Sequence, residues 1–280
     1  MTRKIGAHQS IAGGYHMAMQ RIAQKGGNTL QIFSSSPRSW SFASVDEPTI
    51  QQFIIEKNKL QITPVYFHAS YLINLANNGQ VGRLSKKSLI NELCLAAKMG
   101  IKGSVVHLGS FKEDVNQEKY QILISNIKEV LKQTPKQTLF IIENAGNRKI
   151  GQTIEEIGRI VHDVNEPQVM VCLDTCHLHA AGYNLSTKLK LDHFLAEFDH
   201  KVGLDKLELW HVNDSKDEFG ALRDRHENIG QGKIGLESFR ILINHPQTKN
   251  LPFIIETPGF DNQGPDKQNI DILKSLANNK

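Results

Sequence analysis

The sequence predicts an α/β fold, a (β/α)8 barrel that forms a single domain over residues 1–280. Short β-branched runs alternate with longer amphipathic stretches, and eight such pairs fill the chain. Several runs, such as TLFII at 138–142, are continuously apolar, which is typical of parallel strands covered on both faces. An open, doubly wound sheet is the alternative, but it gives no reason for a count of eight. The sequence shows no linker, low-complexity tract or charge block, so we expect one domain.

The eight units follow one another in a strand-then-helix order. Glycine pairs at 13–14 and 26–27 mark turns between the first elements. In the third helix, Leu89, Leu93, Ala96 and Ala97 fall on one face, as in an amphipathic helix. The predicted strands are Lys4–His8, Thr29–Ser34, Pro64–His68, Ser104–Leu108, Thr138–Asn144, Val169–Asp174, Lys206–Val212 and Pro252–Thr257. The predicted helices that follow them are Gly14–Lys25, Glu47–Leu60, Leu84–Met99, Gln117–Gln133, Thr153–Val164, Lys188–His200, Leu236–Asn244 and Asn269–Asn278.

The composition is that of an ordinary globular protein. Hydrophobic residues make up 39% of the chain, and 33 basic against 29 acidic residues give a net charge of +4, which permits a polyanionic partner without requiring one. Three cysteines are too few for a disulfide scaffold and favour a reducing compartment. The start, MTRKIGAHQS, lacks the apolar segment of a signal peptide, and no apolar run approaches the roughly 18 residues of a membrane span. We therefore expect a cytoplasmic protein that does not bind membranes.

Side chains that can bind metal ions stand at the ends of six consecutive predicted strands, the third to the eighth. The carboxyl ends of barrel strands meet at one rim, where the active sites of such barrels lie. Three further candidates follow shortly after the sixth and seventh strands. The strand-end residues are His68, His107, Glu143, Asp174, His211 and Glu256, and the later ones are His177, Asp224 and His226.

A cluster of metal ions explains these residues better than separate structural roles do. A lone histidine or glutamate at a strand end is usually a hydrogen-bonded structural residue. A glutamate directly after an apolar run is costly to bury unless a cation neutralises it, and this occurs at both Glu143 and Glu256. Histidine and carboxylate ligands without thiolate favour Zn²⁺, Mn²⁺ or Fe²⁺ over Ca²⁺ or Mg²⁺. Nine candidates exceed the needs of one tetrahedral ion, so we predict a multinuclear centre suited to phosphodiester hydrolysis.

Three stretches of the sequence resemble the endonuclease IV family of apurinic/apyrimidinic (AP) endonucleases, and the resemblance extends along the whole chain. They are HASYLINLAN (68–77), VCLDTCHLHAAGY (171–183) and LWHVNDSKDEFGALRDRHENIGQG (209–232). The resemblance implies a TIM barrel with three Zn²⁺ per chain that hydrolyses DNA 5′ to an abasic site in base excision repair. The products would be a 3′-hydroxyl and a 5′-deoxyribose phosphate, and similar enzymes also remove blocking groups from 3′ ends.

The resemblance also implies a role for each candidate ligand. His68 and His107 would hold one zinc ion, and Glu143, the catalytic residue, would bridge it to a second. Asp174, His211 and Glu256 would complete the second site, and His177, Asp224 and His226 would hold the third. Mn²⁺ or Fe²⁺ could replace zinc at one site, because histidine and carboxylate ligands accept each of them.

Four further residues are expected to contact double-stranded DNA that contains abasic sites. By resemblance, Arg38 and the pair Tyr71-Leu72 would enter the minor groove and help to flip out the abasic nucleotide. Arg225 lies between two candidate ligands, and we expect it to bind phosphate. His8 ends the first strand and is a candidate either for support of the ligands or for DNA contact. Because DNA must reach the rim, we expect a monomer.

Two other functions stay open at this stage. Sugar isomerases and epimerases share the barrel and place similar residues at strand ends, but they use one or two ions and have no need for the Asp224-Arg225-His226 segment. A non-catalytic DNA-binding barrel would leave nine intact candidate ligands unexplained.

Overall fold

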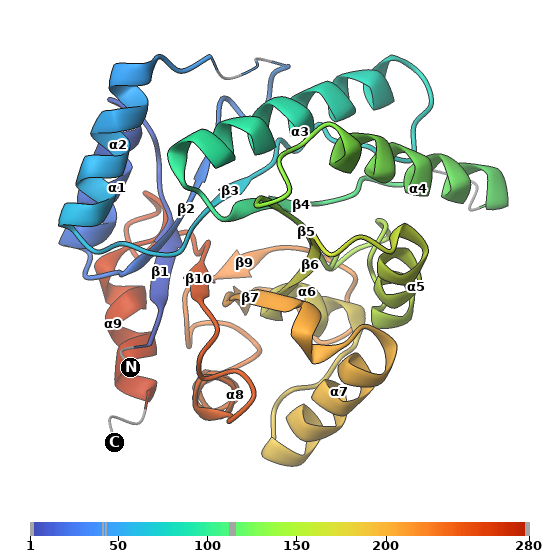
Figure 1. Ribbon diagram of the computed structural model, residues 1–280. Coiled ribbons are helices and arrows are strands. Elements are labelled where there is room, and N and C mark those ends of the chain that lie inside the picture. Colours follow the sequence, from blue (N-terminus) through green and yellow to red (C-terminus); the bar gives the residue numbers. More distant parts are fainter. Residues whose placement is uncertain (1–2, 41, 43, 112–115, 278–280) are drawn as a thin grey trace.

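The computed structural model describes residues 3–40, 42, 44–111 and 116–277, and within them eight parallel strands close into a barrel (Figure 1). Around the barrel the strand order is β1-β10-β7-β6-β5-β4-β3-β2, so the last barrel strand pairs with the first. This confirms the predicted (β/α)8 barrel. The barrel strands are β1 (Ile5–His8), β2 (Thr29–Phe33), β3 (Val65–His68), β4 (Gly103–Val106), β5 (Leu139–Glu143), β6 (Val169–Asp174), β7 (Leu207–His211) and β10 (Phe253–Ile255).

Helices surround the barrel (Figure 1). Buried apolar residues of the helices and the strands pack together in the main hydrophobic core. No helix in the part of the chain that the structure describes is long and apolar enough to cross a membrane. The helices are α1 (Tyr15–Gln24), α2 (Glu47–Lys59), α3 (Gln80–Met99), α4 (Gln117–Lys132), α5 (Ile154–Val164), α6 (Thr175–Ala181), α7 (Lys188–Lys201), η1 (Leu204–Lys206), α8 (Leu236–Asn244) and α9 (Lys267–Leu276).

The structure differs from the predicted elements in a few places. α3 begins four residues before the predicted Leu84, because the Asn77 side chain accepts hydrogen bonds from the backbone N–H groups of Gly79 and Gly82 and so starts the helix in a polar segment. α9 begins at Lys267 with Asp266 as its cap, and its predicted end at Asn278 lies outside the described residues. The short helix α6 and the antiparallel pair β8 (Asp214–Ser215) and β9 (His226–Glu227) were not predicted.

An apolar layer inside the barrel determines where the candidate ligands point. Six buried residues, one from each of β3, β4, β5, β6, β7 and β10, pack together in the interior. Each precedes a strand-end candidate by two positions, and residues two apart on a strand point to the same side. The strand-end candidates therefore point into the barrel one layer above. The six residues are Tyr66, Val105, Ile141, Cys172, Leu209 and Ile254.

Candidate metal centre

The Glu143 carboxylate lies at the centre of the candidate ligands. β5 ends at this residue, which is fully buried. Its Oε2 is 3.2 Å from the Nε2 atoms of both His68 and His107. Its Oε1 is 2.9 Å from His211 Nδ1, on the other side. The two oxygens thus face two separate sets of imidazoles, as the predicted bridging role requires.

A second set of ligand atoms gathers on the His211 side. His211 Nδ1 is 3.3 Å from Glu256 Oε2. Single ligand atoms from Glu143, Asp174, His211 and Glu256 all lie within 4.8 Å of one another. These are the four residues predicted for the second metal site.

The third set lies toward the loop that follows β7. His177 Nε2 is 3.0 Å from Asp224 Oδ1, and His226 Nε2 is 3.4 Å from the same oxygen. Asp174 Oδ2 is 3.6 Å from His226 Nε2, so Asp174 lies between the second and third sets. The structure therefore brings all nine predicted ligands into one continuous cluster.

The histidine side chains are oriented as metal ligands are. In four of the five histidines, one ring nitrogen is within hydrogen-bond distance of a protein oxygen and donates its hydrogen to it. In the neutral imidazole, the other nitrogen then carries the lone pair, and it points toward the carboxylates. A lone pair and a carboxylate oxygen repel each other unless a cation or a proton lies between them. The residues therefore fit a group of divalent cations. The donor contacts are His68 Nδ1 to Ala69 O at 2.8 Å, His177 Nδ1 to Asn144 O at 2.9 Å, His211 Nε2 to Gln31 Oε1 at 2.8 Å and His226 Nδ1 to Glu256 O at 3.3 Å.

Burial and mutual attraction set the ionisation of the cluster. Burial raises the pKa of Glu143, but the surrounding imidazoles, His107 foremost, outweigh this and hold the pKa well below its usual range. Burial lowers the pKa of His177, yet the carboxylates of Asp174 and Asp224 raise it to about 10. For His107 burial prevails, and its pKa falls to about 4. Without bound cations, the cluster is thus held by ion pairs in which His177 keeps a proton.

Neutral amides that the sequence analysis did not single out support the ligands. Asn213 Nδ2 donates to Asp174 Oδ2 at 2.6 Å, and Asn213 Oδ1 accepts from the Glu256 backbone N–H at 2.7 Å. Asn144 Oδ1 accepts from the Asp174 backbone N–H at 2.6 Å. A buried glutamine, Gln31, contacts both His211 and Glu256. For Gln31, the signal in the sequence was a polar residue inside an apolar strand, TLQIF.

A cavity of about 340 Å³ opens above the cluster at the rim. Six of the nine candidate ligands line it, while Glu143, Asp174 and His211 lie buried below. His8 also lines it, with Nδ1 3.5 Å from Glu256 Oε1, which places His8 beside the ligands as one of its two expected roles requires. The lining residues are His8, His68, Tyr71, His107, His177, Asp224, His226, Glu256 and Pro265.

The residues expected to enter the minor groove lie together at one side of this cavity. Tyr71 is 60% exposed, and its ring centre is 6.1 Å from that of His68. Leu72 is half-buried and lines an adjoining cavity, and Arg38 is exposed on the neighbouring loop. A hydrogen bond connects the loop that carries Arg38 to the loop that carries Tyr71: the Pro37 carbonyl accepts from the Tyr71 backbone N–H at 3.2 Å.

Arg225 is placed differently from its neighbours Asp224 and His226. Its guanidinium pairs with Asp217, with Nε 2.7 Å from Asp217 Oδ2 and a second nitrogen on Oδ1. The side chain is still 57% exposed. In this conformation Arg225 holds its own loop, and part of its guanidinium stays open to solvent.

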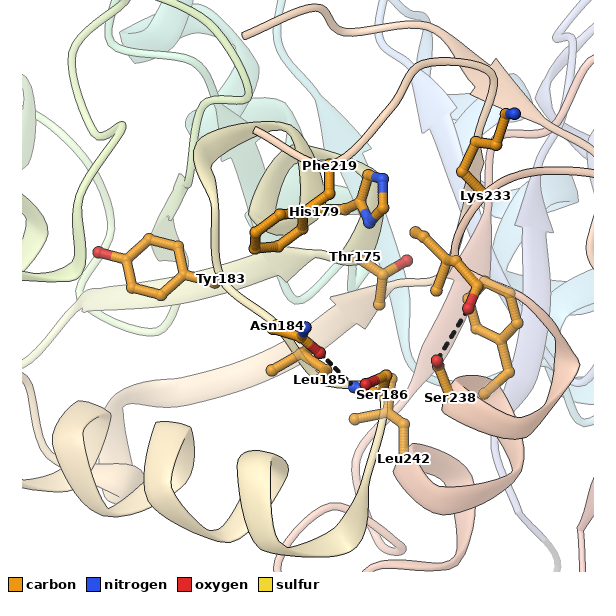
Figure 2. Close-up of a pocket in the computed structure, with 12 residues that line it drawn as sticks. Thr175, His179, Tyr183, Asn184, Leu185, Ser186, Phe219, Lys233, Ser238 and Leu242 are labelled. Carbon is orange, nitrogen blue, oxygen red and sulfur yellow. Dashed lines mark hydrogen bonds between the residues drawn. The ribbon is translucent and has the colours of Figure 1, made fainter. Parts of the chain in front are cut away.

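A smaller cavity, of about 170 Å³, lies behind the same loop, between α6, the segment that joins α6 to α7, and α8 (Figure 2). Phe219 stands beside His179 at this cavity, with ring centres 5.5 Å apart. None of the nine candidate ligands lines it. The chemistry therefore belongs to the rim cavity.

The fold and this cluster define a class of proteins, the (β/α)8 barrels with a histidine–carboxylate metal centre at the carboxyl rim. Residues 19–276 match the family described as xylose isomerase-like TIM barrel. The chain is 38% identical to a "Probable endonuclease 4" of Aquifex aeolicus, over 98% of each chain. It is 31% identical to the solved endonuclease IV of Thermus thermophilus, with a TM-score of 0.86 over 98% of each chain. The chain belongs to the endonuclease IV family, a family of nucleases within the hydrolases.

The similarity to sugar epimerases is more distant. The 3-keto-D-glucoside 4-epimerase of E. coli has a TM-score of 0.70 over 98% of this chain at 16% identity. A likeness at that level of identity concerns the fold alone.

Proposed function

We propose that this protein is an AP endonuclease that hydrolyses DNA 5′ to an abasic site, leaving a 3′-hydroxyl and a 5′-deoxyribose phosphate, in base excision repair. The observation that carries the proposal is the continuous cluster of nine candidate ligands, with the Glu143 carboxylate facing imidazoles on both sides. Three Zn²⁺ would be bound: the first by His68 and His107, the second by Asp174, His211 and Glu256, and the third by His177, Asp224 and His226. Glu143 would be shared by the first two sites. Mn²⁺ or Fe²⁺ could replace zinc at one site.

Divalent cations in such a centre supply an activated water and positive charge for the phosphate oxygens and the leaving alkoxide. The chain's own residues would determine the positions of these cations. Glu143 would help to hold ions at both of the first two sites, because its two oxygens face different imidazoles. The side chains of His177, Asp224 and His226 line the open cavity, so the third set faces an incoming phosphate. No side chain has to act as a nucleophile.

Recognition of the lesion is assigned to the loops beside the cavity. Tyr71 and Leu72 would occupy the space that opens when base pairs part, and Arg38 would fill the gap and pair with phosphate. An abasic nucleotide is already unstacked on one side, so it leaves the helix at lower cost than an intact one. Arg225 would offer phosphate the part of its guanidinium that Asp217 leaves open.

The same site would accept a blocked 3′ end, because it binds a phosphate beside a sugar without a base. We further propose that the chain acts as a single-domain monomer, because the rim has to stay open to DNA, and that it works in the cytoplasm. Its three cysteines are free, as a reducing compartment requires.

The deciding experiment is metal analysis by mass spectrometry together with cleavage of an abasic-site duplex on the same purified sample. We expect about three zinc ions per chain and incision 5′ to the lesion, with an intact duplex of the same sequence left uncut. One or two ions without incision would overturn the proposal in favour of sugar isomerisation. Three ions without incision would overturn the assigned reaction alone.

A further inference from the structure

A fully buried glutamine lies in the middle of β2. Gln31 stands between Leu30 and Ile32 in the strand TLQIF. A primary amide has one accepting oxygen and two N–H donors, and burying it among apolar residues is unfavourable unless these are paired. The partners of Gln31 are therefore the evidence for its role.

Both ends of this amide contact candidate metal ligands. Gln31 Oε1 accepts from His211 Nε2 at 2.8 Å, and Gln31 Nε2 donates to Glu256 Oε1 at 2.6 Å. Gln31 Nε2 also lies 3.1 Å from His8 Nδ1. β2 is separated from β10 by β1, and β7 lies one strand further round. The side chain thus reaches across the barrel interior to join residues of strands that do not pair with its own.

These contacts fix which atoms of the two ligands face the centre. Since Gln31 Oε1 takes the hydrogen on His211 Nε2, the neutral form of His211 that can bind a metal has its lone pair on Nδ1, the atom 2.9 Å from Glu143 Oε1. Since Gln31 Nε2 holds Glu256 Oε1, the second oxygen of Glu256 faces His211 Nδ1 at 3.3 Å. Turning the amide over would set its oxygen against the Glu256 carboxylate, so the arrangement has one stable orientation.

We propose that Gln31 is a positioning residue for the metal centre, one that sets the tautomer of His211 and the rotamer of Glu256 for the ion held with Glu143 and Asp174. This rests on the metal centre assigned under the proposed function. The side chain itself touches neither the metal nor the substrate. Residues that orient ligands in this way typically change metal affinity ten- to a hundredfold when removed.

The test is Gln31→Met, which keeps the length of the side chain but removes its hydrogen bonds to His211, Glu256 and His8. Zinc affinity is measured on the full-length protein by competition with a chromogenic chelator, and the Co²⁺-substituted protein is examined by visible absorption. We expect one of the three ions to bind roughly ten- to a hundredfold more weakly, and the Co²⁺ spectrum to change, while the other two ions bind as in the wild type. The two retained ions also report that the variant is folded.

Gln168→Met is the matched control. Gln168 is another buried glutamine, and it donates to the carbonyls of Pro135 and Thr138 at the opposite end of the barrel. We expect it to lower thermal stability without changing zinc affinity. A second variant, Gln31→Glu, keeps an acceptor for His211 but sets a carboxylate against Glu256, and we expect at least the same loss as in Gln31→Met.

The outcomes separate this inference from the proposal on which it rests. Unchanged chelator resistance and an unchanged Co²⁺ spectrum in both Gln31 variants would reduce Gln31 to a packing residue. An equal loss in Gln168→Met would show a general effect of destabilisation and would also overturn the inference. A wild-type protein that binds no zinc would instead remove the metal centre itself.

Discussion

Asp174 Oδ1 accepts a hydrogen bond from the backbone N–H of His177 at 2.9 Å, so one candidate ligand caps the helix that carries another. α6 has only seven residues, and a helix this short depends strongly on its cap. The position of His177 in the cluster is therefore tied to the side chain of Asp174 in two ways, through the cap and through the shared third set of ligands.

Replacing Asp174 should consequently affect both stability and metal content. We expect Asp174→Ala to lower the free energy of unfolding of the metal-free protein by about 1–2 kcal/mol, the typical effect of losing a cap, and to reduce bound zinc. Thr153→Ala is the control, because Thr153 caps α5 through a 3.1 Å bond to the Glu156 backbone N–H and lies outside the cluster. It should lower stability to a similar extent and keep full zinc content. Full zinc occupancy in Asp174→Ala would contradict the assignment of Asp174 as a ligand.

Replacing Glu143 should remove catalysis and leave the barrel folded. Because residues that only orient ligands already affect metal sites ten- to a hundredfold, Glu143→Ala should reduce single-turnover incision by more than about a hundredfold. Circular dichroism should show the wild-type content of helix and strand. Near-normal turnover with zinc still bound would refute the bridging role of this carboxylate.

The double variant Tyr71→Ala, Leu72→Ala tests recognition of the lesion. Stacking of one aromatic side chain on nucleic acid contributes about 1–3 kcal/mol, so binding to an abasic duplex should weaken roughly ten- to a hundredfold, with far less change for intact DNA. Phe219→Ala is the control, since Phe219 is also exposed, at 49%, but lies at the smaller cavity. Equal losses on abasic and intact duplexes would make Tyr71 and Leu72 structural residues only.

Glu92 predicts a pH dependence of stability in the metal-free protein. Glu92 belongs to α3, and its buried carboxyl group accepts hydrogen bonds from the hydroxyls of Ser34 and Ser104. Burial raises its pKa from 4.5 to about 7. Between these values the native state holds a proton that the unfolded chain releases, so this group makes stability fall as pH rises through that window.

Glu92→Gln should remove this dependence. Measured by urea denaturation of metal-free protein, the variant should match the wild type near pH 4 and exceed it by up to about 3 kcal/mol at pH 8. Glu129→Gln is the control for loss of a surface carboxylate, at a half-exposed position paired with Lys86, and it should keep the fall in stability that Glu92 causes in the wild type. A Glu92→Gln profile parallel to that of the wild type would rule out a raised pKa for this residue.

The sequence was sufficient to predict the barrel, and it also placed the nine candidate ligands at the rim where the structure brings them together, because both predictions follow from local patterns. A residue two positions after an interior residue such as Ile141 must point inward, so Glu143 could be placed from the strand alone. Gln31 and Asn213 could not be found this way, since their roles depend on which strands face each other across the barrel. α6 was missed because seven residues are too few to show a helical period. The start of α3 was misplaced because its first turn is polar.

The apolar layer beneath the cluster has a consequence for how the centre is filled. Tyr66, Ile141 and their neighbours close the barrel below Glu143 within the described part of the chain. An ion therefore reaches the deepest ligands through the rim cavity, which is also the opening that DNA would cover. Under the proposed function, loading of the apoprotein and binding of substrate would use the same entrance, and metal exchange would take place between encounters with DNA.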